Sequence, residues 1–177
     1  MSEPDAFREF VTARYVSLVR YGVLLTGDRG HGEDLVQGAL MKTYRAWARL
    51  HPDGDPDAYT RAVMARAAWR AGRRLWRREV PVDPLPDGPG ADPYPARDTE
   101  HAVLAGLRVL PADQRVVLVL KYWAGLSDEE IAARLGCAPG TVKSRAGRAR
   151  ERLRRLGGLF GDLDGTPRPG DRGLVPP

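Results

Sequence analysis

The sequence contains very few of the side chains that build disulfides, metal sites and enzyme active sites. It has 177 residues, of which one is a cysteine and three are histidines. A single cysteine, Cys137, excludes an internal disulfide and indicates a reducing compartment. The chain has no G-x-x-x-x-G-K-S/T phosphate loop, no H-E-x-x-H pair and no cysteine–histidine cluster. We therefore expect no metal, no cofactor and no enzymatic activity.

Long hydrophobic runs are missing as well. The N-terminal stretch MSEPDAF is acidic and lacks the apolar segment of a signal peptide. No apolar run approaches the length that is needed to cross a bilayer. We therefore expect no membrane insertion and a cytoplasmic location.

Charge, in contrast, is abundant and unevenly distributed. The 28 Lys and Arg residues outnumber the 23 Asp and Glu residues, and the net charge of +5 favours a polyanionic partner. Residues 61–78 hold seven arginines and no acid, and residues 139–156 hold seven basic residues and one acid. Two such clusters, far apart in the chain, indicate two separate nucleic-acid-binding helices.

Composition divides the chain into four segments. Residues 1–78 and 99–156 show the apolar periodicity of helices and no strand pattern. Residues 79–98 contain six prolines and five acids, which predicts an extended linker. Residues 157–177 are about half Gly and Pro and predict a disordered tail. The expected fold class is all-α, with two small helical domains joined by a flexible linker.

The first domain is expected to contain helices at about 5–25, 31–50 and 56–78. In the second of these, periodicity predicts that one stripe is buried and that the opposite face is exposed. The buried stripe is Val36, Leu40, Thr43, Trp47 and Leu50. The exposed face carries Asp34, Gln37, Met41 and Arg45. In the third helix, the residues expected to face inward are Tyr59, Val63, Met64 and Ala67.

The third helix also places aromatic side chains among arginines. Trp69 and Trp76 lie between arginines at positions 66, 70, 73, 74 and 77. Aromatic rings beside positive charge can stack single-stranded bases, a contact worth roughly 1–3 kcal/mol per base. The alternative for Trp69 is a place in the hydrophobic core, and the sequence leaves both interpretations open.

Residues 126–156 have the pattern of a helix-turn-helix. Ser127 and Glu130 have the spacing of a capping box at the start of a first helix. Gly136 is placed to end that helix in a left-handed conformation, and Pro139 suits the first turn of the next one. The second helix has an apolar stripe, which is Val142, Ala146, Ala149, Leu153 and Leu156.

The N-terminal part of such a second helix meets base edges in the major groove. The side chains placed there can bind bases or phosphates, because Arg pairs bidentately with guanine and Ser or Thr can contact either group. These candidate side chains are Thr141, Lys143, Ser144, Arg145 and Arg148.

Two longer motifs resemble a known family. They are EDLVQGALMKTYRAW at 33–47 and LPADQRVVLVLKYWAGLSDEEIAARLGCAPGTVKSRAGRARERLR at 110–154. Both are similar to segments of the extracytoplasmic-function sigma factors of bacterial RNA polymerase, group 4 of the sigma-70 family. The chain is also similar to the actinobacterial SigE-like subfamily. The first motif resembles region 2.2, and the second resembles region 4.

The resemblance implies a function and assigns roles. A sigma factor binds core RNA polymerase and directs it to promoters by reading their −10 and −35 elements. The residues implied to contact core polymerase are Asp34, Leu35, Gln37 and Met41. Those implied to contact the −10 element, which is melted, are Arg66, Trp69, Arg70, Arg73, Arg74 and Arg77. Those implied to read the double-stranded −35 element are Thr141, Lys143, Ser144, Arg145 and Arg148. An anti-sigma factor is a further candidate partner.

The main alternative is a helix-turn-helix transcriptional regulator that acts without being a polymerase subunit. Regulators of the LuxR type resemble residues 126–156 in outline. Such a protein would need an N-terminal sensor domain, with a ligand pocket or a phosphorylatable Asp after a strand. Residues 5–78 offer no strand pattern and instead a second arginine-rich helix, which favours the sigma factor.

Overall fold

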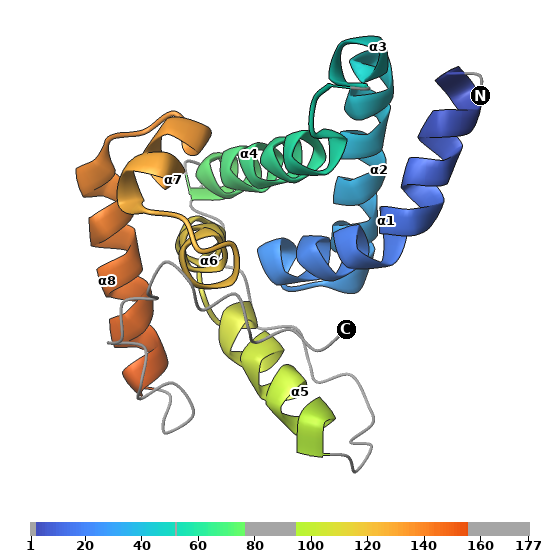
Figure 1. Cartoon of the computed structure of the whole chain (residues 1–177). Helices are drawn as coiled ribbons and strands as arrows, with labels where there is room; N and C mark the ends of the chain where they lie inside the picture. The colour runs from blue at the N-terminus through green and yellow to red at the C-terminus, as the bar shows by residue number, and fades with distance from the viewer. Residues whose placement is uncertain (1–2, 52, 77–94, 156–177) are drawn as a thin grey trace.

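The computed structural model describes residues 3–51, 53–76 and 95–155, and every regular element in these ranges is helical (Figure 1). The first half of the chain consists of α1 (Glu3–Thr26), α2 (Arg29–Arg45), α3 (Trp47–Leu50) and α4 (Pro56–Trp76). The second half consists of α5 (Pro95–Arg108), α6 (Ala112–Leu118), the π-helix η1 (Val119–Trp123), α7 (Asp128–Leu135) and α8 (Pro139–Arg155). The expected all-α fold is confirmed. The predicted tail and residues 79–94 of the predicted linker lie outside the described residues.

The boundaries of the first helices follow from their capping residues. Gly27 has a φ of 75°, which reverses the chain between α1 and α2. Asp28 then caps α2, because its side chain accepts a hydrogen bond of 2.8 Å from the backbone N–H of His31. The helix expected over 31–50 is divided at Ala46 into α2 and α3. In the second half, α5 begins at Pro95, earlier than the boundary expected at 99.

Helix α4 is buried on a different face from the one expected. Met64 is fully buried as predicted, whereas Tyr59, Val63 and Ala67 are only half-buried. The most buried positions besides Met64 are Thr60, Ala65, Ala68 and Trp69. The reason is that α4 contacts α1 and α2 on one side and α6 and α7 on the other. Figure 1 shows α4 crossing the middle of the molecule between these two groups of helices.

The helix-turn-helix forms as its turn chemistry predicts. The Ser127 hydroxyl accepts from the N–H of Glu130 at 3.2 Å, and the Glu130 carboxylate accepts from the N–H of Ser127 at 2.8 Å. Gly136 ends α7 in the left-handed conformation with a φ of 68°, and Pro139 begins α8. The stripe of α8 is buried at Val142, Ala146, Ala149 and Leu153, and Leu156 lies outside the described residues.

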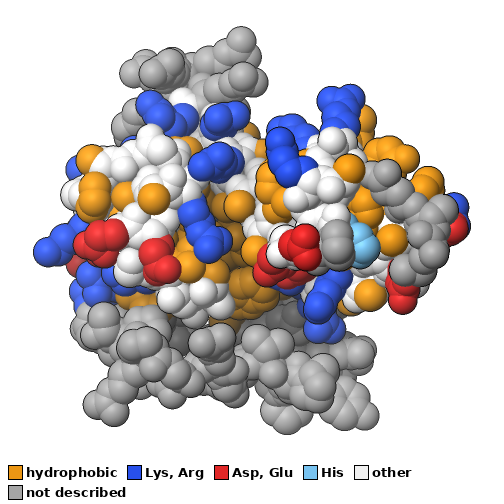
Figure 2. Space-filling model, turned by 45° about the horizontal axis from the view of Figure 1, so that its top comes forward, with side chains coloured by type: hydrophobic (Ala, Val, Ile, Leu, Met, Phe, Trp, Pro, Cys, Tyr) orange, Lys and Arg blue, Asp and Glu red, His pale blue; other side chains and the backbone are white. Residues whose placement is uncertain are grey.

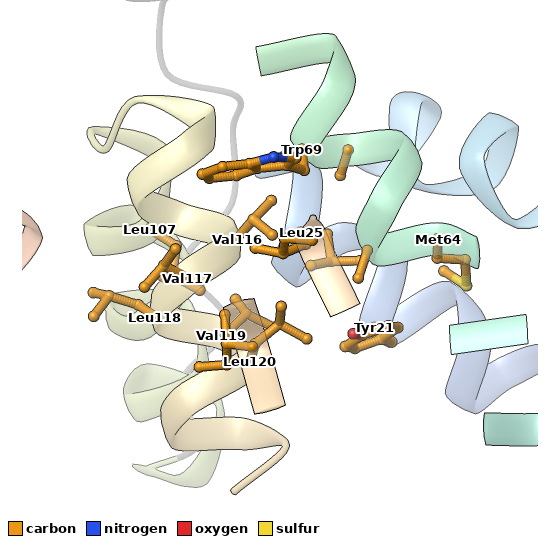
Figure 3. Packing of buried hydrophobic residues seen from close by; sticks show 14 of the residues in the cluster. Tyr21, Leu25, Met64, Trp69, Leu107, Val116, Val117, Leu118, Val119 and Leu120 are labelled. Atoms are coloured by element: carbon orange, nitrogen blue, oxygen red, sulfur yellow. The ribbon is translucent and has the colours of Figure 1, made fainter. Parts of the chain in front are cut away.

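One hydrophobic cluster runs through both halves of the chain. It joins Leu25 of α1 and Trp69 of α4 to Val116 of α6. Figure 3 shows these three side chains pointing toward one another. The cluster continues along α6, η1, α7 and α8 to Leu153. The halves that the sequence predicts as two domains are therefore packed against each other in this structure.

Candidate nucleic-acid interface

The recognition helix α8 presents several of its predicted DNA-reading side chains to solvent. Lys143, Ser144 and Arg148 are exposed, and Thr141 is half-buried at the start of the helix. These residues lie away from the buried stripe of α8, so they can approach a groove while the stripe remains packed. Figure 2 shows blue basic side chains gathered along the upper part of one face, on both sides of the hollow at its centre.

Arg145 is placed differently from its neighbours on α8. Its Nε atom lies 2.7 Å from the Oδ2 atom of Asp113 at the start of α6. Its guanidinium also lies over the ring of Trp69 on α4, with the Cζ atom 5.0 Å from the ring centroid. The side chain is 27% exposed. Arg145 therefore contacts both halves of the chain, and Asp113 and Trp69 occupy the guanidinium that is predicted to read the −35 element.

The predicted −10 residues on α4 divide into exposed and occupied side chains. Arg70 and Arg73 are exposed and free to meet phosphates. Arg66 is also exposed, but its Nε donates to the carbonyl oxygen of Arg134 at 2.6 Å. Arg77 lies outside the described residues, as does the side chain of Arg74.

Trp69 occupies the core, which is one of the two places that the sequence allowed. Only 2% of the residue is exposed, and its Nε1 atom has no hydrogen-bond partner among the described residues. A buried indole cannot stack a base while this arrangement holds. Sequence periodicity could not distinguish the two interpretations, because the burial depends on α6 and α8 reaching α4.

The predicted polymerase-binding face of α2 is exposed as expected. Asp34 and Gln37 are exposed, and 61% of Met41 is accessible to solvent. Leu35 is half-buried and packs against the hydrophobic cluster. Tyr44, 50% exposed on the same helix, is a further apolar candidate that the sequence analysis did not single out. It lies within the motif at 33–47, where its position off the buried stripe was the available signal.

Two arginines outside the predicted sites join the two halves. Arg108 Nε donates to the carbonyl oxygen of Gly27 at 2.8 Å. Arg115 donates from Nε to the carbonyl of Leu107 at 2.8 Å and from Nη2 to that of Leu110 at 2.8 Å, and its Nη1 donates to the carbonyl of Thr26. Burial lowers the pKa of Arg115 to about 10, with a smaller contribution from the charge of Arg108.

An aromatic pair forms a second junction between the halves. Tyr21 of α1 stacks on Trp123 of η1, with ring centroids 5.0 Å apart. The Arg61 guanidinium lies over both rings, at 5.2 Å from the Tyr21 centroid and 5.3 Å from the Trp123 centroid. Burial raises the pKa of Tyr21 to about 12, although the charges of Arg61 and Arg134 act in the opposite direction.

Other kinds of site find little support in the described part of the chain. No group of three or more His, Cys, Asp or Glu side chains within it could hold a metal ion. None of its helices combines the length and apolar character of a membrane span. Burial raises the pKa of the half-buried Cys137 thiol, which does not favour the reactive thiolate.

Comparison with known proteins assigns both halves to the same family. Residues 10–78 match sigma-70 region 2, and residues 100–153 match sigma-70 region 4. The RNA polymerase sigma-E factor of Streptomyces coelicolor is 39% identical over 156 residues, which cover 87% of this chain and 87% of that protein. The ECF RNA polymerase sigma factor SigM of Mycobacterium tuberculosis is 32% identical over 156 residues, covering 88% of this chain and 79% of SigM.

Two solved structures resemble the fold. The sigma factor RpoE of Bartonella quintana, in complex with the anti-sigma factor NepR, matches with a TM-score of 0.58 and 27% identity over 85% of this chain and 96% of that one. CnrH, in complex with the cytosolic domain of CnrY, matches with a TM-score of 0.52 and 28% identity over 86% of this chain and 88% of that one. With regions 2 and 4 in order along one polypeptide, the chain belongs to the extracytoplasmic-function group of the sigma-70 family of RNA polymerase sigma factors.

Proposed function

We propose that this chain is a transcription initiation factor that binds core RNA polymerase and directs it to specific promoters through their −10 and −35 elements. The observation that carries the proposal is the presence of regions 2 and 4 together in one chain. The chain supplies sequence specificity, and the polymerase makes the RNA. We expect it to act in the cytoplasm, where that polymerase works.

Core polymerase is proposed to bind the exposed face of α2. Asp34 and Gln37 supply polar contacts, and the exposed thioether of Met41 supplies apolar area that binding can remove from water. Leu35 is proposed to contribute from its half-buried position beside them. Gly38 is exposed on the same helix, and a Cβ atom added there would meet no other atom within 4 Å.

Promoter DNA is proposed to meet α4 and α8. On α4, Arg70 and Arg73 bind phosphates of the melted −10 element, with further contacts from the −10 candidates Arg66, Trp69, Arg74 and Arg77. On α8, base and phosphate contacts in the −35 major groove come from Thr141, Lys143, Ser144, Arg145 and Arg148. Because the two regions sit on one chain, the second contact is made at high effective concentration, and neither contact has to be strong alone.

The proposed division of the chain is a region 2 domain at 1–78, a linker at 79–98, a region 4 domain at 99–156 and a tail at 157–177. An anti-sigma factor is a candidate regulatory partner, because the sigma factor RpoE described above is bound to the anti-sigma factor NepR. A regulator that binds DNA without polymerase is the remaining alternative, and the match to region 2 disfavours it.

The direct test is to ask whether the purified chain co-migrates with core polymerase and supports run-off transcription from a promoter. The double variant Gln37→Ala/Met41→Ala should weaken co-migration, while Glu129→Ala, an exposed change on α7, should leave it unaltered. A chain that binds promoter DNA alone and never supports initiation would contradict the proposal.

A further inference from the structure

We propose that Met41 is a site of reversible oxidation, at which a peroxide converts the thioether to a sulfoxide and so weakens the binding of core polymerase. The inference rests on the proposed function, because it concerns the face of α2 that is proposed to bind polymerase. Met41 is 61% exposed on that face. Its oxidation therefore changes the proposed contact surface and leaves the hydrophobic core of the protein intact.

Met41 is the one exposed sulfur-containing residue in the part of the chain that the structure describes. Met64 is fully buried in the hydrophobic cluster (Figure 3). Cys137 is half-buried, and burial raises the pKa of its thiol, which disfavours the reactive thiolate. Met1 lies outside the described residues. An oxidant in solution therefore meets the thioether of Met41 more readily than either of the other two described sulfur atoms.

The surface of α2 around Met41 leaves this thioether uncovered. A helical side chain leans over the turn on the N-terminal side of its own Cα, which for Met41 holds Gln37 and Gly38. Gly38 has no side chain, and a Cβ atom added there would meet no other atom within 4 Å. One turn later, the ring of Tyr44 lies against that of Phe7 on α1, with centroids 4.9 Å apart. An oxidant can therefore approach Met41 from the side of the bare glycine.

The reaction is a two-electron oxidation of the sulfur by transfer of one oxygen atom. The O–O bond of hydrogen peroxide breaks, an S=O bond forms, and the products are methionine sulfoxide and one molecule of water. Methionine sulfoxide reductase reverses the change. In that step two thiols are oxidised to a disulfide, and the oxygen atom leaves as water. The modification can therefore be made and removed without loss of the protein.

A sulfoxide changes what α2 presents to polymerase. The thioether supplies apolar area whose removal from water favours binding, and oxidation converts it into a polar side chain. The sulfoxide oxygen must give up its bound water when the interface closes, which is unfavourable unless a new donor meets it. We expect the chain oxidised at Met41 to bind core polymerase about tenfold more weakly, in line with the effect of an unpaired polar group at a buried position.

Peroxide treatment of the full-length chain tests the inference. A Cys137→Ser parent removes the thiol as a second target. Cleavage after Lys and Arg places the three methionines on separate peptides, residues 1–8, 30–42 and 62–66, so mass spectrometry measures the oxidation of each. Peptide 30–42 should take up one oxygen atom before peptide 62–66 does. Co-migration of the oxidised chain with core polymerase should then fall about tenfold, and methionine sulfoxide reductase with dithiothreitol should restore it.

Two variants of Met41 and a matched control identify the methionine that is responsible. Met41→Leu keeps apolar area without a sulfur atom and should resist peroxide. The quantity compared is the ratio of core affinity before and after treatment of each variant, so a changed starting affinity does not affect the comparison. Met41→Gln introduces a polar side chain and should weaken binding without peroxide. Met64→Leu, at the buried position, should respond to peroxide as the parent does.

The outcomes separate this inference from the proposed function. If the untreated parent does not co-migrate with core polymerase, the proposed function fails, and this inference fails with it. If the parent binds but the chain oxidised at Met41 binds equally well, the inference is wrong and the proposed function stands. The same holds if Met41→Leu loses as much affinity as the parent after treatment.

Protection by polymerase gives an independent measurement of the same contact. In the complex with core polymerase, peptide 30–42 should be oxidised several-fold more slowly than in the free chain, because the interface covers Met41. Equal rates of oxidation in the free and bound chains would place Met41 outside the interface and would contradict the inference.

Discussion

At the scale of single residues, the arginine side chains fall into two groups: some are exposed to solvent, and others bind backbone carbonyls of the same chain. Arg70, Arg73 and Arg148 are exposed and available to nucleic acid. Arg115 is 9% exposed and binds backbone carbonyls of its own chain. A count of charges in the sequence does not distinguish these residues. Only the exposed arginines can contribute directly to DNA affinity.

Arg148→Ala should weaken binding of the holoenzyme to its cognate promoter by roughly 1–3 kcal/mol if Arg148 pairs with a base. The exposed side chain makes this possible without any rearrangement of α8. Binding assays that compare the native −35 box with a mutated one measure the effect. Mutation of the −35 box should reduce the affinity of the wild-type holoenzyme more than that of the variant holoenzyme. An equal response from both proteins would exclude Arg148 as a base reader, and Arg152→Ala, at another exposed position of α8, serves as control.

Arg115→Met should lower the free energy of unfolding by about 3 kcal/mol. The change would remove the guanidinium donor from the buried carbonyls of Leu107 and Leu110, although Leu107 keeps a hydrogen bond from the N–H of Leu110. Each lost hydrogen bond to a charged group costs roughly 1.5–3 kcal/mol. Urea denaturation followed by circular dichroism measures the loss. Arg152→Ala should change stability by less than about 0.5 kcal/mol. A comparable loss in both variants would show that the backbone contacts of Arg115 contribute little.

At the scale of elements, residues close in sequence define the helix-turn-helix, whereas the helices packed around α4 determine which of its faces is buried. The capping box at Ser127 and the left-handed Gly136 define α7 with residues that are close in sequence. Helix α4, in contrast, packs against helices from both halves of the chain. The sequence pattern therefore predicts the ends of α7 well and the buried face of α4 poorly.

Ser127→Ala should destabilise the protein by about 1 kcal/mol through loss of the N-cap. Hydrogen bonds from Ser127 lower the pKa of the Glu130 carboxyl below its usual 4.5. A depressed carboxyl pKa stabilises the fold above the unfolded-state pKa, and this contribution is lost as the pH falls through the folded-state value. The backbone N–H of residue 127, which is the larger cause of the lowered pKa, remains in the variant, and only the hydroxyl is lost. Thermal melts between about pH 3 and 7 should therefore show a slightly shallower acid dependence in the variant. Ser144→Ala, an exposed change within α8, should keep the wild-type dependence.

At the scale of the whole molecule, promoter binding should fall steeply with salt because two basic helices displace counterions from DNA. Lys143→Ala should reduce the log–log slope of holoenzyme affinity against salt by about one unit if Lys143 binds a phosphate. The preference among −35 sequences should stay the same, because a phosphate contact carries no base information. An unchanged slope would place Lys143 away from the backbone of the DNA.

The sequence alone determined the helical class, the helix-turn-helix and the exposed face of α2, because each depends on residues within a few turns of one another. The arrangement of the two halves was decided only in three dimensions. Neither periodicity nor charge could place Trp69 beneath Arg145, since those residues come from helices that a long segment of chain separates. Burial of an aromatic ring depends on which distant surface reaches it, and that is a property of the packed molecule.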